Sequence, residues 1–430
     1  MFGIRSKLRF FLEQLGEKLW IRPAVFCTLA VLAALTAAGA DSLGSLNFIP
    51  KVDHDTVEKL LSIIAASMLG VATFAVASMV SAYASVSNSA TPRAFPLVVS
   101  DDASKTVLST FIGAFIFSVV ALISIRAGIY GRTGLFLVFV MTISVLGWVV
   151  LSFVRWVDQI ARLGRLGTTI DRAEKAAEAA IERRRRSPTF GGLPIDDNAD
   201  KGEPLFADVI GYVQHFNVEA LQACAEKYKG VLTVTALPGT FVAPGRALGF
   251  FNSDAGCARR EFDSSFFTKE FLIGSDRTFD QDPRFGLIAL SEIASRALSP
   301  AVNDPGTAID IIGTFVRLFA LWVSPIEDEQ NSPNVKCDRV RIPSLTLDDM
   351  CDDAFTAIAR DGAGAIEVVV RLQKAFISLS SLKHEELKDE MYRHSELALA
   401  RAEIALKLPG DFQRARAVAE RVTRSSNPSR

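Results

Sequence analysis

The sequence predicts an α-helical polytopic membrane protein with four transmembrane helices and an α+β cytoplasmic domain, in which a small β-rich module precedes a helical region. Four apolar segments lie in the first 153 residues, and no comparable run follows. A hydrocarbon core of about 30 Å requires roughly 20 apolar residues in a helix. We therefore expect crossings at Ala24–Ala40, Leu60–Tyr83, Thr106–Ile125 and Gly134–Phe153, none of which contains Asp, Glu, Lys, Arg or His.

The composition agrees with a chain that is only partly embedded in a membrane. Hydrophobic residues make up 49% of the 430 residues, and the mean hydropathy is +0.26. The formal net charge of −1 provides no global attraction to nucleic acid, so we expect the lipid bilayer and no nucleic acid as a partner. The five cysteines are scattered and never stand at zinc-binding or thioredoxin spacing, and we expect no metal or cofactor.

Basic residues near the ends of the apolar segments predict the orientation. Five Lys or Arg residues precede the first segment, and many follow the fourth, including the run Arg183–Arg186. The three connecting loops hold two each. The positive-inside rule then places the N-terminus and the C-terminal region in the cytoplasm of a bacterial inner membrane, with four crossings between them. Ala38-Gly39-Ala40 also matches a signal-peptidase site, and cleavage there would leave three crossings with the same C-terminal side.

Changes in pattern divide the chain into seven parts. Proline and glycine clusters mark the linker, and the period changes from helical to strand-like after it. The expected parts are a basic amphipathic segment (1–23), the transmembrane domain (24–153), a helical stalk (154–186), a linker (187–203), the β-rich module (204–258), a mainly helical region (259–424) and a disordered tail (425–430).

Individual elements of the soluble part follow from the same patterns. In the module we expect strands at 206–212 and 231–236 around a helix at 218–227. Helices should follow at 286–298, 308–323, 347–360, 363–382, 385–408 and 412–424. Asp304 and Pro305 suit the N-cap and first position of the second of these. That helix is apolar, but it contains Asp310 and Arg317, so we expect a buried helix of the soluble part.

A stripe of small residues marks the second crossing. It consists of Ser62, Ala66, Gly70, Thr73, Ala77 and Ser81, which recur at helical spacing on one face. Small residues let helix backbones approach closely in lipid, where packing drives association. A weakly polar stripe of this kind also suits the lining of a pore, and the sequence leaves both readings open.

A polar cluster at a helix–turn–helix junction is the candidate ligand site of the soluble part. Glu292 and Arg296 stand four apart on one helix, and Asn303 and Asp304 precede the next. The alternative is a structural corner whose polar groups satisfy one another. We favour the structural corner.

Three other charged patterns carry weaker functional signals. Asp276, Asp280 and Asp282 lie within seven residues but lack the glycine and terminal glutamate of a calcium loop, so we expect a solvated turn. Glu390 and His394 have the spacing of a metal pair, but we expect a solvated helix face. The run Arg183–Arg186 favours the end of a stalk with mild attraction to anionic lipid.

Four strings resemble a bacterial family of predicted membrane proteins known as DUF2254. They are Ala90-Thr91-Pro92-Arg93-Ala94, Gly211-Tyr212-Val213-Gln214, Pro238-Gly239-Thr240-Phe241-Val242 and the long, specific string from Arg296 to Ala308. The likeness runs from about Phe26 to about Phe376. It implies an inner-membrane protein with four crossings and a cytoplasmic C-terminal region, and it implies no activity or site.

These observations favour a homo-oligomeric, channel-like protein for a small ion or solute, with a cytoplasmic assembly or gating domain. The spans contain no charge, which argues against ion-pair-driven transport. The alternative is a non-transporting, membrane-anchored sensor or scaffold. No converging nucleophile, base or metal set indicates an enzyme.

Overall fold

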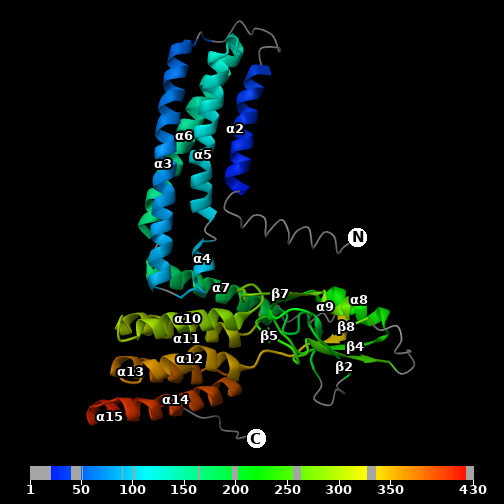
Figure 1. Ribbon diagram of the computed structural model, residues 1–430. Coiled ribbons are helices and arrows are strands. Elements are labelled where there is room, and N and C mark those ends of the chain that lie inside the picture. The colour runs from blue at the N-terminus through cyan, green and yellow to red at the C-terminus, as the bar shows by residue number, and fades with distance from the viewer. Residues whose placement is uncertain are drawn as a thin grey trace. The chain divides into compact units, whose positions relative to one another are not determined.

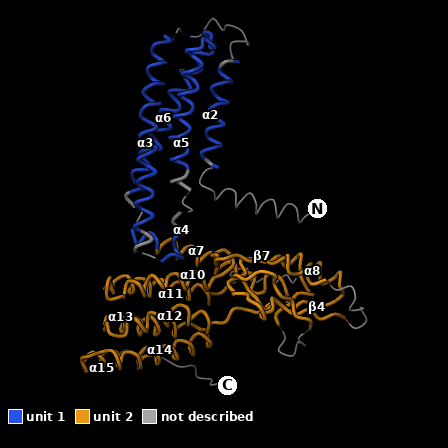
Figure 2. The backbone as a smooth tube through the Cα atoms, in the orientation of Figure 1, with its two compact units in different colours: residues 1–169 blue, residues 170–430 orange. Residues whose placement is uncertain are grey.

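The protein forms two compact units, residues 1–169 and residues 170–430, called unit 1 and unit 2 below (Figure 2). The computed structural model describes residues 21–39, 50, 52–89, 91–99, 102–162, 165–195, 202–254, 263–326 and 336–422. Most of the predicted basic segment (1–23) and all of the predicted tail (425–430) lie outside these ranges.

Unit 1 is a helix bundle built around one central helix (Figure 1). Its elements are α2 (Ile21–Gly39), α3 (His54–Ser89), the short α4 (Phe95–Val99), α5 (Asp102–Arg126) and α6 (Arg132–Arg162). Helix α5 packs against α2, α3 and α6, which explains why Phe111 and Phe117 are almost completely buried. On α3, α5 and α6, large apolar side chains also remain exposed, as expected for helices in contact with lipid.

Three of the four predicted crossings coincide with helices that are long and apolar enough to span a membrane, namely α3, α5 and α6. At the first predicted crossing, α2 contains a shorter apolar stretch, Pro23–Ala37. Among the described residues, α11 (Pro305–Val323) is the fourth helix that meets the length and composition criterion. It lies inside unit 2, where it buries Ile311, Phe315 and Phe319 and packs against α10 and α13. Those contacts support its assignment as a core helix.

The predicted helical stalk (154–186) is divided between two helices. Helix α6 ends at Arg162, and α7 begins at Leu166. Gly164 and Gly167 lower the helix propensity at this point. Helix α7 (Leu166–Arg186) also differs from a solvated stalk, because Ala173, Ala177 and Ile181 are buried.

Two small sheets form the β part of unit 2. The larger has the strand order β1 (Gly192–Leu193), β8 (Cys337–Arg341), β4 (Gly230–Val234), β6 (Gly249–Ser253) and β2 (Glu203–Leu205). The smaller has the order β5 (Phe241–Val242), β3 (Gly211–Phe216) and β7 (Phe271–Gly274). Helix α8 (Val218–Lys227) packs on β4 and β8, and α9 (Ser265–Thr268) is a single turn beside it.

The sheet draws on a longer part of the chain than the predicted module 204–258. Strand β8 comes from 337–341 and pairs in parallel with β4, where Leu232 lies opposite Val340. The strand expected at 206–212 is displaced to β3, at Gly211–Phe216. Strand β8 lies about 100 residues after β4, so no local turn pattern connects the two strands. Three of its five residues are charged, so its sequence lacks the apolar pattern of a buried strand.

The helical part of unit 2 consists of three consecutive helix pairs that stack in sequence (Figure 1). They are α10 (Pro283–Ala297) with α11, α12 (Leu347–Asp361) with α13 (Ile366–Ser380), and α14 (Glu385–Ala405) with α15 (Pro409–Ala419). Helices α10, α12 and α14 are neighbours in one row, and α11, α13 and α15 in the other. All six helices expected here are present, with shifted ends. Phe355 holds the stack together, with its ring 5.5, 5.4 and 5.1 Å from those of Phe315, Phe319 and Phe376.

Candidate functional site

The small-residue stripe of α3 faces away from the bundle. Ser62 is half-buried, and Ala66, Gly70, Thr73, Ala77 and Ser81 are exposed. The buried face of α3 is a different one, made of Leu61, Ile64, Met68, Ala72, Ala75 and Met79. A Cβ atom added at Gly70 would meet nothing within 4 Å. From Ala66 to Ser81 the stripe is therefore exposed and lies outside the buried face of its own bundle.

Close packing inside unit 1 occurs instead at α5. A Cβ atom at Gly113 would lie 3.2 Å from Phe26 Cβ on α2, so the two helices approach closely here. The Tyr130 hydroxyl donates a hydrogen bond to the carbonyl oxygen of Ala34 over 2.9 Å. With Phe111 and Phe117 also buried, side chains fill the described interior of a single bundle.

The predicted corner at residues 292–304 is held by hydrogen bonds within itself. Asn303 has a φ of 51°, and its N–H donates to the carbonyl oxygen of Ser299 over 2.8 Å. Asp304 caps α11, because its carboxylate accepts hydrogen bonds from the N–H and the hydroxyl of Thr307 at 3.2 and 2.6 Å. These bonds lower the pKa of Asp304, first through the Thr307 hydroxyl. Glu292 and Arg296 both lie on α10, the helix that precedes the turn.

The acidic turn at residues 276–282 is not solvated throughout, which corrects the expectation from sequence. Asp282 is only 3% exposed and caps α10, and its Oδ2 lies 2.7 Å from the Arg277 guanidinium. Burial raises the pKa of Asp282, and Arg277 opposes that rise. The turn that contains Gly239 packs directly on the Arg277–Asp282 pair, since a Cβ atom at Gly239 would lie 2.1 Å from Asp282 Oδ2.

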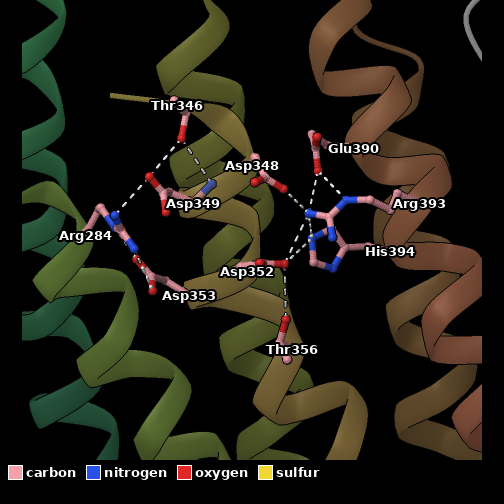
Figure 3. A network of polar contacts seen from close by, with 10 residues as sticks. All are labelled: Arg284, Thr346, Asp348, Asp349, Asp352, Asp353, Thr356, Glu390, Arg393 and His394. Carbon is pink, nitrogen blue, oxygen red and sulfur yellow. Dashed lines mark hydrogen bonds and ion pairs between the residues drawn. The ribbon is translucent and has the colours of Figure 1, made fainter. Parts of the chain in front are cut away.

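A network of carboxylates and arginines joins three helices of the stack (Figure 3). Helix α12 presents two pairs of aspartates. Arg284 of α10 lies 3.0 Å from Asp349 and 2.6 Å from Asp353. Arg393 of α14 lies 2.5 Å from Asp348 and 3.1 Å from Asp352, and it also contacts Glu390. Each carboxylate of α12 thus has a cationic partner, which makes the network a clamp between helices.

His394 lies at the buried edge of this clamp, and the expectation of a solvated face for it is wrong. Its side chain is 2% exposed, and its Nε2 is 3.4 Å from Asp352 Oδ1. Burial lowers its pKa to about 4, with a smaller contribution from Arg393, so the imidazole is neutral at physiological pH. In the described ranges, no three His, Cys, Asp or Glu side chains are placed to hold a metal ion.

The arginine run at the end of α7 contacts the protein rather than forming a free cationic end. Arg183 lies 3.1 Å from Asp280, and Arg186 lies 3.6 Å from Glu182. Arg184 is buried and donates to the carbonyl oxygen of Pro343 over 3.1 Å, while Arg185 donates to the carbonyl and hydroxyl oxygens of Ser324. Sequence reasoning missed this arrangement, because the partners of Arg184 and Arg185 are 159 and 139 residues away along the chain, respectively.

Comparison with known proteins identifies relatives without a described activity. The matched curated proteins include uncharacterised proteins of Mycobacterium bovis (strain ATCC BAA-935 / AF2122/97) and Mycobacterium tuberculosis (strain ATCC 25618 / H37Rv), each 35% identical over 112 residues. Another, from Mycobacterium tuberculosis (strain CDC 1551 / Oshkosh), is 37% identical over 114 residues. The matched segments cover 25% of this chain and 21% of each relative. No solved structure matches.

The family comparison covers most of the chain. The model of a family described as "Predicted membrane protein (DUF2254)" matches residues 16–378, which include all of the described helices of unit 1 and most of unit 2. The resemblance inferred from the four sequence strings is therefore confirmed. This chain belongs to the DUF2254 family of predicted membrane proteins.

Proposed function

We propose that the protein is a homo-oligomeric, channel-like protein of the bacterial inner membrane, whose copies meet along the small-residue stripe of α3. A small ion or solute would pass beside this stripe, between copies. Unit 2 would lie in the cytoplasm and serve as the assembly or gating domain.

The exposed position of the stripe is the observation that carries this proposal. Small residues on a membrane helix usually serve close helix contacts. Here Gly70, Thr73 and Ala77 have no such contact within their own bundle, while larger apolar residues beside them, Ile63 and Phe74, are 65% and 64% exposed. A partner helix from a second copy would use the space that the small residues leave open.

Two further features favour passage between copies over passage through one bundle. The described interior of the bundle is occupied by large side chains such as Phe111 and Phe117. The apolar segments contain no Asp, Glu, Lys, Arg or His, so a proton relay or ion-pair-driven cycle would have no titratable group to use. Hydroxyl and backbone groups of the stripe would line a weakly polar path.

Flux through purified protein reconstituted in liposomes tests the proposal. Gly70→Leu places a bulky side chain on the stripe, and we expect it to abolish flux. Gly147→Leu is the matched control, because Gly147 on α6 is also exposed and a Cβ atom there also meets nothing within 4 Å. Both variants should insert and fold, since neither introduces a clash in a single copy.

The outcomes separate the proposal from its alternatives. Flux in the wild type and in Gly147→Leu, with loss in Gly70→Leu, supports passage along α3. Equal flux in both variants removes α3 from the path. Absence of flux for a panel of ions and small solutes, with the oligomer verified by crosslinking, contradicts the channel-like function.

A sensor or scaffold is the second candidate, favoured by an exposed apolar projection at the corner between α10 and α11. Pro300, Ala301 and Val302 are all exposed there, and Val302 is 51% exposed although it is apolar. A photo-crosslinking residue at position 302 should capture one defined protein partner in cells. The same residue at Ile404, which is also apolar and is 89% exposed, is the control, and identical capture at both positions would contradict this role.

A further inference from the structure

A small pocket opens in unit 2 where the end of α7 meets the end of α11 and the segment after β8. Its volume is about 220 Å³, and its lining combines Arg184, Arg185, Ser324 and Ser344 with apolar side chains that include Trp322 and Leu345. Among the residues that the structure describes, no carboxylate lines the pocket. All of these residues belong to unit 2.

Arg184 is an unusual group to find at the wall of a pocket. Its side chain is buried, with 3% exposure, and its guanidinium stacks 4.2 Å from the centre of the Phe190 ring. One end donates to the carbonyl oxygen of Pro343, but the buried Nε–H has no hydrogen-bond acceptor among the described residues. A buried charged donor without an acceptor is costly, so the site favours an acceptor from outside the chain.

Arg185 adds a second positive charge to the same wall. It is held in place by the carbonyl and hydroxyl oxygens of Ser324, which are neutral partners. Burial lowers the pKa of Arg184 to about 10 and also lowers the pKa of Arg185, yet both remain cationic at neutral pH. The nearest carboxylates that act on them, Asp282 and Glu182, do not line the pocket.

We propose that this pocket binds a phosphate monoester whose organic part is small and apolar. A phosphate group accepts hydrogen bonds on three terminal oxygens and suits the fork of a guanidinium, which matches a site with two arginines and the Ser344 hydroxyl. The apolar lining beside Trp322 and Leu345 would cover the organic part. The volume lies below the range of about 300–1,000 Å³ typical of drug-sized ligands, which limits that part to roughly one ring or a short chain.

Titration calorimetry on the full-length protein in detergent, with ionic strength matched by chloride, tests the assignment. Phenyl phosphate is the main probe, inorganic phosphate tests the head group alone, and benzoate tests a carboxylate on the same ring. Dihexanoyl phosphatidic acid tests a lipid source of the same head group. We expect phenyl phosphate to bind and benzoate to bind at least about tenfold more weakly, because a carboxylate satisfies fewer donors.

Three variants locate the binding. Arg185→Gln should weaken the binding of phenyl phosphate by about tenfold or more through the loss of a charged donor. Ser344→Trp fills the pocket from an exposed position and leaves both arginines in place, so it should abolish binding even if an arginine variant folds poorly. Arg186→Gln is the control, since Arg186 belongs to the same run but does not line the pocket.

Each result decides the proposal independently of whether the protein conducts solutes. Binding that Ser344→Trp and Arg185→Gln remove and Arg186→Gln keeps supports the site. Preference for phosphatidic acid over phenyl phosphate supports the site with a lipid as its source. Binding of no phosphate probe, binding that survives Ser344→Trp, or equal binding of benzoate overturns it.

Discussion

The Nε–H of Arg284 on α10 donates to Asp353 Oδ2 on α12 over 2.6 Å, and the same guanidinium reaches Asp349 one turn away at 3.0 Å. The Asp353 side chain is 16% exposed, and burial raises its pKa while Arg284 opposes the rise. This ion pair therefore joins α10 to α12 in a partly dry environment, where the loss of one partner leaves the other charge poorly solvated.

Arg284→Met should destabilise unit 2 by about 2 kcal/mol, because Asp353 would lose its partner while it stays largely buried. The thermal midpoint can be followed by the reaction of a fluorogenic maleimide with Cys351, which is fully buried on α12. Arg360→Met is the control, because that side chain is 65% exposed and its pairing with Asp361 is expected to be worth less than about 1 kcal/mol. Equal effects of the two substitutions would contradict the argument.

His394 should make the stability of unit 2 depend on pH in mildly acidic solution. The unfolded chain binds a proton at His394 near pH 6.5, whereas the folded protein binds it only near pH 4. Stability is therefore highest above pH 6.5 and falls as the pH drops towards 4, by about 3 kcal/mol at about 1.4 kcal/mol per pKa unit. We expect His394→Gln to lower the midpoint measured by circular dichroism at neutral pH but to flatten its pH dependence. The exposed His54→Gln should keep the wild-type slope, and an unchanged slope in His394→Gln would refute the assignment.

Gly239→Ala should be one of the most damaging single-methyl changes in unit 2. Gly239 has a φ of 91°, and its added Cβ would lie 2.1 Å from Asp282 Oδ2. Strain and collision with the buried Arg277–Asp282 pair should together cost about 3 kcal/mol. Gly245→Ala separates the two effects, because Gly245 has a φ of 87° but open space around its Cβ, and it should cost about 1 kcal/mol in the same maleimide assay. Similar losses in both variants would exclude the collision.

Substitutions at Asp304 distinguish a helix cap from a ligand group. Asp304→Ala removes the acceptor for the Thr307 N–H and should cost about 1 kcal/mol, whereas Asp304→Asn keeps an acceptor and should cost only a few tenths. Chemical denaturation of both variants, with the maleimide reporter, measures the difference. A loss in Asp304→Asn as large as that in Asp304→Ala would show that the charge matters beyond capping.

In unit 1, sequence reasoning located the helices but not their faces. The helices at α3, α5 and α6 follow from uninterrupted apolar composition, a local property that the bilayer requires of each segment separately. Which face of α3 is buried depends on where α5 lies. The stripe that contains Gly70 and Ala77 has the spacing of a packing face, yet Leu61, Ile64 and Met68 on another face make the contacts.

In unit 2, capping and helix positions were predictable, while the charged and buried groups were not. Asp304 and Pro305 begin α11 as expected, because a cap depends on residues only three positions apart. The many charged residues around His394 predict a solvated helix face. The burial of His394 beside Phe355 and Asp352 depends on neighbouring helices.

The sequence by itself determined that the chain enters a membrane, that six helices follow in its later part, and to which family it belongs. Those properties depend on residues that are close along the chain. The tertiary structure decided that β8 completes the sheet, that α7 is a core helix, and that Arg184 and Arg185 line a pocket rather than a free surface. In each of these cases, burial or hydrogen bonding depends on partners more than 100 residues away along the chain. The local sequence pattern does not indicate which distant segment will make the contact.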